Sequence, residues 1–314
     1  MWAFMSRAIP WLAVYGFGAH IKSTQKKLII LNKGIVEEFP LDEVQNLLVV
    51  GGHTLNSTTI FHLLKNDSYI SFFEPDGTPV GIIRPFGNCN DKEIQHIQED
   101  LPRHRYATII AQASLRSRLI AIEQLQDQRG SDLLYDGELQ ILHKALNELE
   151  YLVKLEEIRR LSNLTTDMYY EILSRDIPEC FNFKRRTVRP QCDPINAMLS
   201  FGYAMLYGNC CVSVIGARLD PDLGLLHEGP GALVQDFIGP FKTGMVDSVV
   251  FSMAQDSLKL GDFELTSSRC MLSETLVKNL ISAFKKSIDN QKIDNQVNNF
   301  LKAIQKIEDF KVMY

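Results

Sequence analysis

The sequence predicts an α+β multidomain protein, with a small, mostly-β N-terminal domain followed by a larger all-α C-terminal domain. Three observations predict this order: strand-like apolar runs up to about residue 85, helix-like periodicity after about residue 90, and a change of composition between them. The 314 residues suffice for two domains, and a hydrophobic content of 45% suffices for a substantial core. We expect the β domain to cover residues 1–88, a linker and the start of the helical region 89–104, and the helical domain 105–314.

Short β-rich runs separated by turns are predicted in the N-terminal part. The motif NKG at 32–34 indicates a turn. The run QNLLVVGG predicts a buried strand that ends at its glycines. The next segment is NSTTIFHLLKND, which predicts a short helix capped by Asn56 or Ser57. A hairpin around Asp76 and Gly77 is predicted by YISFFEPDGTPVGIIRP.

A linker near residues 85–92 leads into the helical part. We expect residues 89–130 to be helical, a further helix over 133–160, and helical structure to the C-terminus apart from loop-rich stretches at 176–193 and 217–245. The tail after residue 290 predicts a polar terminal helix that is prone to fraying.

Composition and charge limit the function classes. A net charge of −5 does not indicate a nucleic-acid binder, so any DNA-binding surface must be local. The six cysteines contain no CxxC pair, which favours reduced thiols over a zinc or disulfide framework. The apolar start of the chain is broken by Ser6, Arg7 and Pro10, and no window holds about 18 uninterrupted apolar residues. We expect a cytoplasmic protein without a membrane span.

A histidine and an aspartate stand out in LDPDLGLLHEGPGALVQDFIGPFK, residues 219–242. His227 follows a turn-forming Asp-Pro-Asp and a short apolar run, and Asp236 comes nine residues later within an apolar stretch. An imidazole and a carboxylate can both ligate a metal ion, but two ligands seldom complete a site. The pair therefore indicates a candidate site that needs further ligands from elsewhere in the chain.

Four stretches, taken together and in order, resemble the CRISPR adaptation integrases, the Cas1 endonuclease family. They are the strand–helix–strand run GGHTLNSTTIFHLLKNDSYISFFEPDGTPVG, DPINAMLSFGYAMLYG at 193–208, LDPDLGLLHEG at 219–229 and ALVQDFIGPFKTGMVDSVV at 232–250. The second carries the family's Asn, Leu-Ser and Gly-Tyr, and the third its Asp-Pro, Gly and terminal His. The fourth carries its Asp, Pro-Phe-basic and Val-Asp series, so that the resemblance covers nearly the whole chain.

The resemblance implies a function in CRISPR adaptation. Members of this family bind short DNA fragments and, with the small Cas2 partner, insert them into a CRISPR array as new spacers. A DNA 3′-hydroxyl attacks a phosphodiester in this reaction, and the same site nicks branched DNA with water as the nucleophile. The negative charge that develops requires a divalent cation, Mg²⁺ or Mn²⁺. The resemblance also implies a homodimer formed through the N-terminal β domain.

Three direct metal ligands are implied by the family: a glutamate on a helix, a histidine, and an acid three residues after an aspartate. His227 matches the histidine and Asp236 matches the aspartate. Aligning IRRLSNLTTDMYYEIL at 158–173 with the family's helix places Ser162 at the glutamate, and Gly239 stands where the second acid is expected. His227 is the remaining catalytic candidate, and His227 and Asp236 are the remaining metal-ligand candidates.

Nearby acids do not replace the two missing carboxylates in this interpretation. Glu157 and Asp167 each lie five positions from Ser162, so they point about 140° away from it on a straight helix. Glu228 adjoins His227 and is the third candidate. The loss of two negative charges from a site that holds a dication predicts impaired metal binding and impaired catalysis.

Local basic clusters are the expected DNA contacts. The first contains Lys184, Arg185, Arg186 and Arg189, within FKRRTVRP. The second contains Arg103, Arg105, Arg116 and Arg118. Lysine and arginine in a loop suit contacts to DNA phosphates, and a solvated charged face is the alternative for each cluster. Tyr169 and Tyr170 match family aromatics but are expected to be core residues.

Two functions from different classes follow. The chain is either an active metal-dependent DNA integrase and endonuclease, or a catalytically impaired paralogue that binds DNA and docks on Cas2 as a structural or regulatory subunit. Ser162 and Gly239 favour impaired chemistry, whereas the fold alone is compatible with both. An unrelated helical DNA-binding protein would require all four motif matches to be accidental.

Overall fold

The structure is a computed structural model, and the residues that it describes are residue 9 and residues 11–75, 77–85, 90–129, 133–188, 191–266, 269–306 and 309–314. Parts of the predictions lie outside these described residues. They are most of the first ten residues, Asp76 of the hairpin, Cys89 in the linker and Arg189 of the first basic cluster.

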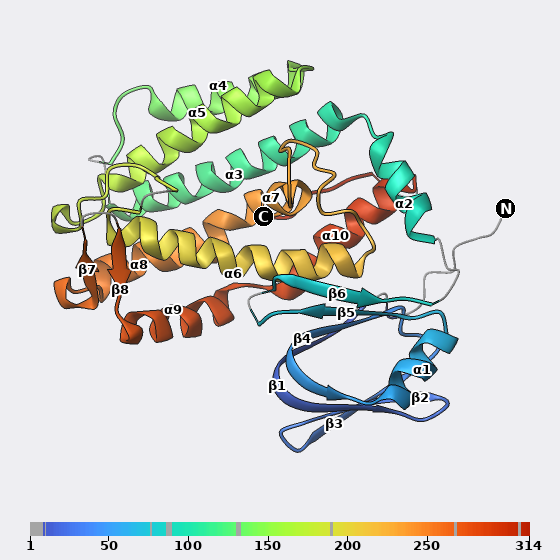
Figure 1. Ribbon diagram of the computed structural model, residues 1–314. Helices are drawn as coiled ribbons and strands as arrows, with labels where there is room; N and C mark the ends of the chain where they lie inside the picture. The colour runs from blue at the N-terminus through green and yellow to red at the C-terminus, as the bar shows by residue number, and fades with distance from the viewer. Residues whose placement is uncertain are drawn as a thin grey trace. The chain divides into compact units, whose positions relative to one another are not determined.

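The chain divides into two compact units. The first unit contains residues 1–101 together with 208–221, and the second contains 102–207 together with 222–314. Figure 1 shows the β strands of the first unit in blue to cyan and the helices of the second from green to red. The predicted boundaries at residues 88 and 104 remain a prediction, and the inclusion of 208–221 in the first unit was not predicted.

A six-stranded sheet forms the first unit, in the order β3-β2-β1-β4-β5-β6. Its strands are β1 (Leu12–Ser23), β2 (Lys27–Asn32), β3 (Ile35–Pro40), β4 (Asn46–Leu55), β5 (Tyr69–Phe73) and β6 (Pro79–Ile83). β4 runs parallel to β1 and β5, and the remaining neighbours are antiparallel. Helix α1 (Ser57–Lys65) connects β4 to β5. Asn56, one of the two caps that the sequence predicted, accepts a hydrogen bond from the Thr59 amide at 2.8 Å.

The two faces of this sheet bury different cores. One face buries residues such as Ile21 and Leu47 together with Leu63 of α1. The other buries Leu48 and Val50 against Val212, which explains why residues 208–221 belong to this unit.

Strand β4 does not stop at its glycines, which corrects the prediction of a glycine stop. It continues through Gly51 to Leu55. A Cβ atom on Gly51 would lie 2.1 Å from the Gly16 carbonyl oxygen, and the φ angle of Gly51 is +96°. The glycine therefore permits a close approach of β1 and β4 that no other residue allows.

In its described residues, the second unit is helical apart from loops and a two-stranded sheet, β7 (Phe263–Leu265) with β8 (Cys270–Leu272), which was not predicted. Its α-helices are α3 (Arg103–Arg129), α4 (Glu138–Glu148), α5 (Leu155–Ser174), most of α6 (Pro194–Gly216), α7 (Ala232–Ile238), α8 (Ser248–Asp256), α9 (Glu274–Ser287) and α10 (Asn290–Ile304). Shorter 3-10 turns are η1 (Leu149–Tyr151), η2 (Glu179–Phe181), η3 (Gly239–Phe241) and η5 (Leu260–Asp262), and η4 (Thr243–Asp247) is a π-helical turn.

Both long stretches that the sequence predicted to be helical contain a break. The stretch 89–130 consists of two helices, α2 (Asn90–Glu99) in the first unit and α3, because Pro102 cannot continue a helix. The helix predicted over 133–160 is α4 and the start of α5, separated by extended backbone at Leu152 and Lys154. The loop predicted over 217–245 contains α7 and η3.

The prediction of a fraying tail is wrong for α10. Phe300 is completely buried, and its ring centre lies 5.1 Å from that of Phe237 and 5.7 Å from that of Tyr106. Apolar residues three to four positions apart give the helix a buried stripe. The prediction overlooked this stripe because most residues of the tail are polar.

Among the described helices, α6 alone is long and apolar enough to cross a membrane by length and composition. Of its apolar window, 56% is buried inside the protein, and core helices pass the same test. Burial in a protein core explains the composition of α6.

Candidate functional site

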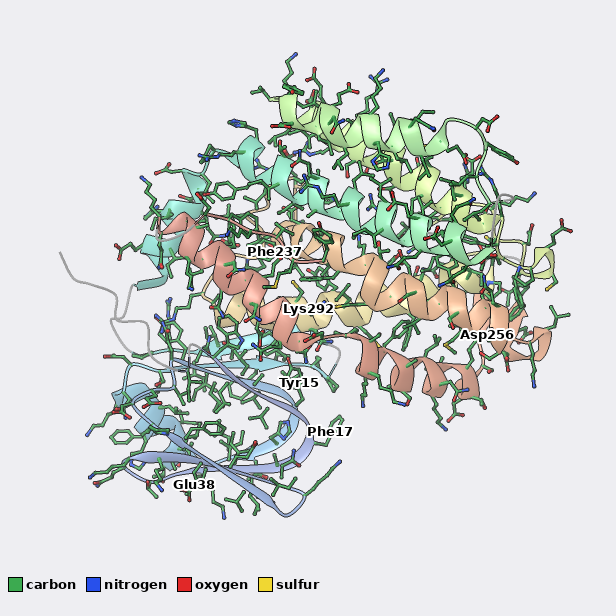
Figure 2. The ribbon with its side chains drawn as sticks, turned by 180° about the vertical axis from the view of Figure 1, so that it is seen from behind. Tyr15, Phe17, Glu38, Phe237, Asp256 and Lys292 are labelled. Atoms are coloured by element: carbon green, nitrogen blue, oxygen red, sulfur yellow. The ribbon has the colours of Figure 1, made fainter. Side chains whose placement is uncertain are left out.

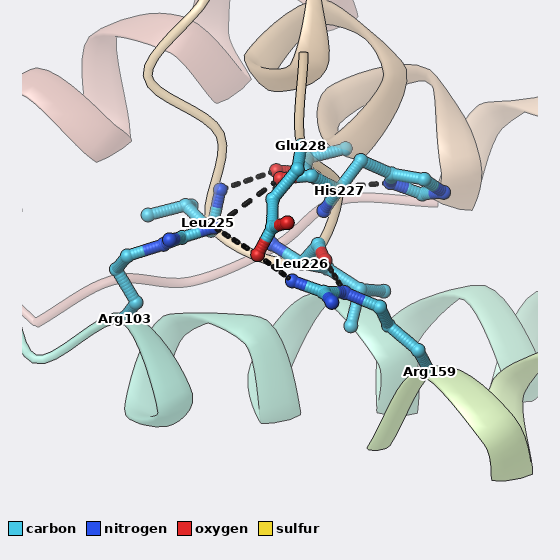
Figure 3. A network of polar contacts seen from close by, with 7 residues as sticks. Arg103, Arg159, Leu225, Leu226, His227 and Glu228 are labelled. Carbon is cyan, nitrogen blue, oxygen red and sulfur yellow. Dashed lines mark hydrogen bonds and ion pairs between the residues drawn. The ribbon is translucent and has the colours of Figure 1, made fainter. Parts of the chain in front are cut away.

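Asp236 and His227 form the centre of the candidate site. Figure 3 shows His227 with Glu228 and the two arginines that contact its loop. Asp236 is completely buried on α7, and His227 lies on the preceding loop with a half-exposed side chain. The His227 Nδ1 atom lies 2.6 Å from Asp236 Oδ1, so the ring donates its Nδ1 proton to the carboxylate. This hydrogen bond fixes the ring and leaves Nε2 as the nitrogen available to a ligand.

The same carboxylate holds the loop that carries His227. Asp236 accepts the backbone N–H groups of Leu225 at 2.6 Å, Leu226 at 3.1 Å and His227 at 3.0 Å. Its two oxygens therefore accept hydrogen bonds from four donors. The structure brings together the two residues that the sequence singled out, but the Asp236 oxygens are already occupied within the chain.

Two arginines clamp the other side of this loop. Arg159 of α5 donates from Nε to the Leu226 carbonyl oxygen at 2.5 Å and from Nη2 to Glu228 Oε1 at 2.5 Å. Arg103 of α3 donates to the His227 carbonyl oxygen at 3.3 Å. Hydrogen bonding and the charge of Arg159 lower the pKa of Glu228, which thus stays an ionised partner of the arginines.

The position predicted to have lost a glutamate lies on the same side of α5 as this clamp. Ser162 is one turn after Arg159, and side chains three positions apart are neighbours on a helix. Of the alternative acids, Glu157 pairs with Lys154 at 3.7 Å, and Asp167 lines a groove elsewhere in the unit. Neither acid is directed to Ser162.

Gly239, where the second acid is expected, begins the 3-10 turn that follows α7. Its φ of −47° is helical, so the backbone accepts any side chain. A Cβ atom there would lie 2.8 Å from the Ser114 hydroxyl oxygen of α3, which must turn aside to admit it.

The described residues do not fit a Mg²⁺ or Mn²⁺ ion. No three His, Cys, Asp or Glu residues come together as possible metal ligands in the described parts of the chain. Asp236 is occupied by internal donors, Glu228 is paired with Arg159, and Ser162 and Gly239 supply no charge. A hard dication prefers six or more oxygen ligands, several of them charged. A single imidazole nitrogen does not provide such a site.

A buried polar network that the sequence did not predict surrounds Asp247 of η4. Tyr169 donates to its Oδ2 at 3.0 Å, Tyr203 donates to its Oδ1, and Tyr170 shares a hydrogen bond with the Tyr203 hydroxyl. Burial raises the pKa of Asp247 to about 6, against the opposing effect of these hydroxyl donors. Tyr169 and Tyr170 are buried core residues, as expected, and their hydroxyls also take part in this hydrogen-bond network.

Three cationic side chains lie near this network. Lys242 Nζ and the Arg186 guanidinium carbon each lie 5.3 Å from the centre of the Tyr203 ring, and Arg118 lies 6.0 Å from that of Tyr169. Burial, followed by the charge of Arg118, lowers the pKa of Lys242 to about 8. One buried carboxylate thus stands among three cations.

The first basic cluster is split between interior and surface. Arg186 donates to Asn196 Oδ1 at 2.9 Å and to the Ser200 hydroxyl at 2.8 Å, so it supports the start of α6. Lys184 and Arg185 are exposed and make no ion pair with another described side chain. They line an open groove of about 750 Å³ together with Asp167, Glu171, Ser174, Arg175, Arg186, Thr187 and Val188.

Comparisons with known proteins agree with this fold. The family described as CRISPR associated protein Cas1 matches residues 12–286. A relative from Methanospirillum hungatei, "Putative CRISPR-associated endonuclease Cas1 2", is 40% identical over 299 residues, which cover 95% of this chain and 99% of the relative.

Solved structures with low sequence identity share the fold. A "Casposase bound to integration product" has a TM-score of 0.82 at 20% identity and covers 96% of this chain and 97% of its own. A chain of a "Partial Cas6-RT-Cas1--Cas2 complex" has a TM-score of 0.76 at 19% identity and covers 96% and 99%. Since the family match spans most of the sequence and the Methanospirillum relative nearly all of it, this chain belongs to the CRISPR-associated Cas1 family, as its four motifs predicted.

Proposed function

We propose that this chain is a DNA-binding subunit of CRISPR adaptation in which the metal-dependent endonuclease and integrase chemistry of Cas1 is impaired. The observation that carries the proposal is the absence of carboxylates at Ser162 and Gly239, beside a histidine and a buried aspartate that remain in place. We assign Asp236 to positioning His227 and its loop, since its oxygens are saturated. Spacer integration itself then needs carboxylates from another protein.

DNA binding is supported by the relatives and by the charged groove. The two similar structures are a casposase with its integration product and a complex that contains Cas2. Within an acidic chain, Lys184 and Arg185 are exposed cations side by side in sequence at the groove. We place the DNA backbone along this groove, with a small Cas2 protein as partner and the cytoplasm as the compartment.

Replacing both exposed cations is expected to weaken DNA binding in a salt-dependent way. For Lys184→Gln/Arg185→Gln, the slope of log K against log salt for a short duplex is expected to become less negative by about 1.8, or about 0.9 for each lost phosphate contact. Fluorescence anisotropy between low and moderate salt measures it. Lys285→Gln/Lys286→Gln on α9 removes the same charge from another exposed surface and serves as control. Equal slopes for the two double variants would place the DNA elsewhere.

We also propose a homodimer formed through the N-terminal β unit. Tyr15 and Phe17 of β1 are large apolar side chains with exposed fractions of 40% and 67% (Figure 2). Neighbouring exposed apolar residues on a sheet are typical of an interface. Phe17→Glu is expected to convert the dimer into a monomer in size-exclusion chromatography with light scattering, and Lys33→Glu in the β2–β3 turn should leave it dimeric. A wild-type monomer at all concentrations contradicts this proposal.

A further inference from the structure

We infer that the corner beside Gly239 is a metal-independent binding site for a phosphate group, with Lys242 and Arg118 as its cationic donors. This inference deepens the proposed function, on which it rests for DNA as the source of the phosphate. With acidic ligands at these positions, the corner would bind a metal cation. Without them, the cations of this chain favour an anion there.

The backbone places the two cations next to the vacant acid position. Residues three apart in a 3-10 turn lie on the same side, so Lys242 follows Gly239 along η3. Ser114 faces Gly239 from α3, and Arg118 is one turn further along that helix. The Ser117 hydroxyl lies 3.4 Å from that of Thr243, which confirms that the two segments run side by side at this level.

Neither cation of this pair makes an ion pair with a described acid, although the charge of the buried Asp247 acts on both of them. Arg118 is 8% exposed, and its Nη1 atom is buried without a hydrogen-bond partner. Lys242 makes no hydrogen bond or ion pair with a described residue and contacts the Tyr203 ring instead. A buried guanidinium nitrogen without an acceptor is costly, so an orphan donor of this kind indicates a missing anionic partner.

The acids near this pair have other partners. Both Asp247 oxygens accept tyrosine hydroxyls, and both Asp236 oxygens accept donors of the His227 loop. The third cation, Arg186, is held by Asn196 and Ser200. Two cations without a bonded carboxylate therefore remain in the described part of the chain, and they suit a tetrahedral oxyanion that accepts from a guanidinium and an ammonium group together. The same charges repel a divalent cation.

The first test uses inorganic phosphate, with EDTA present to remove metal ions. Thermal-shift titration with phosphate is expected to stabilise the wild type, whereas chloride at equal ionic strength does not. Lys242→Gln is expected to weaken phosphate binding about tenfold or more, and Lys242→Arg to restore it. Lys286→Gln, which removes an exposed lysine of α9, should bind as the wild type does. Stabilisation by chloride equal to that by phosphate, or equal binding by Lys242→Gln, overturns the inference.

The second test uses a short DNA duplex, again in EDTA, and distinguishes DNA from free phosphate as the source. Lys242→Gln is expected to weaken binding about threefold to tenfold and to reduce the salt slope by about 0.9. DNA binding without a phosphate effect in the first test leaves the proposed function standing and overturns this inference. A Lys242-dependent phosphate effect without any DNA binding supports the site, with free phosphate as its ligand, and contradicts the proposed function.

The pH dependence of the DNA test follows from the ammonium group. The groups that face Lys242 are Arg118 from α3, Arg186, Asp247 from η4 and Asp236 from α7. With a pKa of about 8, Lys242 is charged at pH 7 and neutral above pH 9. The difference in affinity between wild type and Lys242→Gln is therefore expected to be present at pH 7 and to disappear as the pH rises through 8 to 9. A difference that is unchanged at pH 9 contradicts the role of the ammonium charge.

Discussion

Wild-type protein is expected to give no strand transfer from a labelled short duplex into a CRISPR-repeat plasmid in Mn²⁺, with or without Cas2, whereas Ser162→Glu/Gly239→Glu is expected to gain it. The two carboxylates return two charged oxygen ligands to the side of α5 and to the turn after α7, where His227 already has its ring fixed by Asp236. Removing one transition-state-stabilising group from an enzyme costs about 100- to 1,000-fold. The restored variant should therefore give about a hundredfold or more integrated label above the background of the assay, at which the wild type remains.

The packing around the second position decides how the variant is built. A side chain at Gly239 meets the Ser114 hydroxyl at 2.8 Å, so Ser114→Ala should be combined with the double variant to make room. Each single replacement is a control, because one carboxylate with one imidazole leaves the dication short of ligands. Adding His227→Ala to the restored variant should abolish the gain.

The opposite result has a definite meaning. If the wild type integrates DNA and His227→Ala does not, other acids complete the metal site, and the proposal of impaired chemistry is wrong. Glu228 is then the first residue to test, although it must leave Arg159 to serve as a ligand. If the restored variant and the wild type are both inert while DNA binding is intact, more than two carboxylates separate this chain from an active integrase.

The fold was predicted well where the determinants are local. Apolar alternation predicted the strands, and Asn56 or Ser57 as a cap predicted the start of α1. Pro102 marks the break between α2 and α3, which the prediction of a helical 89–130 did not specify. The inclusion of 208–221 in the first unit could not be predicted, because it depends on Val212 packing against a sheet far away in sequence. The buried stripe of α10 was hidden by polar residues between its apolar positions.

The site was predictable in its members but not in their roles. The spacing of His227 and Asp236 and the family motifs identified both residues, and the hydrogen bond between them makes them one unit. Nothing in the sequence distinguishes an aspartate that ligates a metal from one that holds three backbone N–H groups. Arg186 shows the same limit: it belongs to a basic cluster by sequence, but its guanidinium is bound to Asn196 in the structure.

Replacing Asp236 by asparagine is expected to destabilise the second unit by about 3–5 kcal/mol in urea unfolding followed by circular dichroism. Asparagine has one acceptor oxygen, and its amide nitrogen would face backbone donors that the carboxylate now accepts, such as those of Leu225 and His227. The Leu225–His227 segment then loses its anchor. The matched control is Asp256→Asn on the surface of α8, where the carboxylate accepts a hydrogen bond from the Ser252 hydroxyl (Figure 2).

The comparison of the two variants separates a structural anchor from a free ligand. The control is expected to stay within about 0.5 kcal/mol of the wild type, since it replaces an exposed side chain with one of equal size. If Asp236→Asn is as stable as the control, the loop N–H groups must find other acceptors, and Asp236 is free to serve as a metal ligand after all. If it is destabilised as expected, the carboxylate is required by the fold of the His227 loop. Its presence in the sequence then says nothing about metal binding, and impaired chemistry is compatible with a retained His–Asp pair.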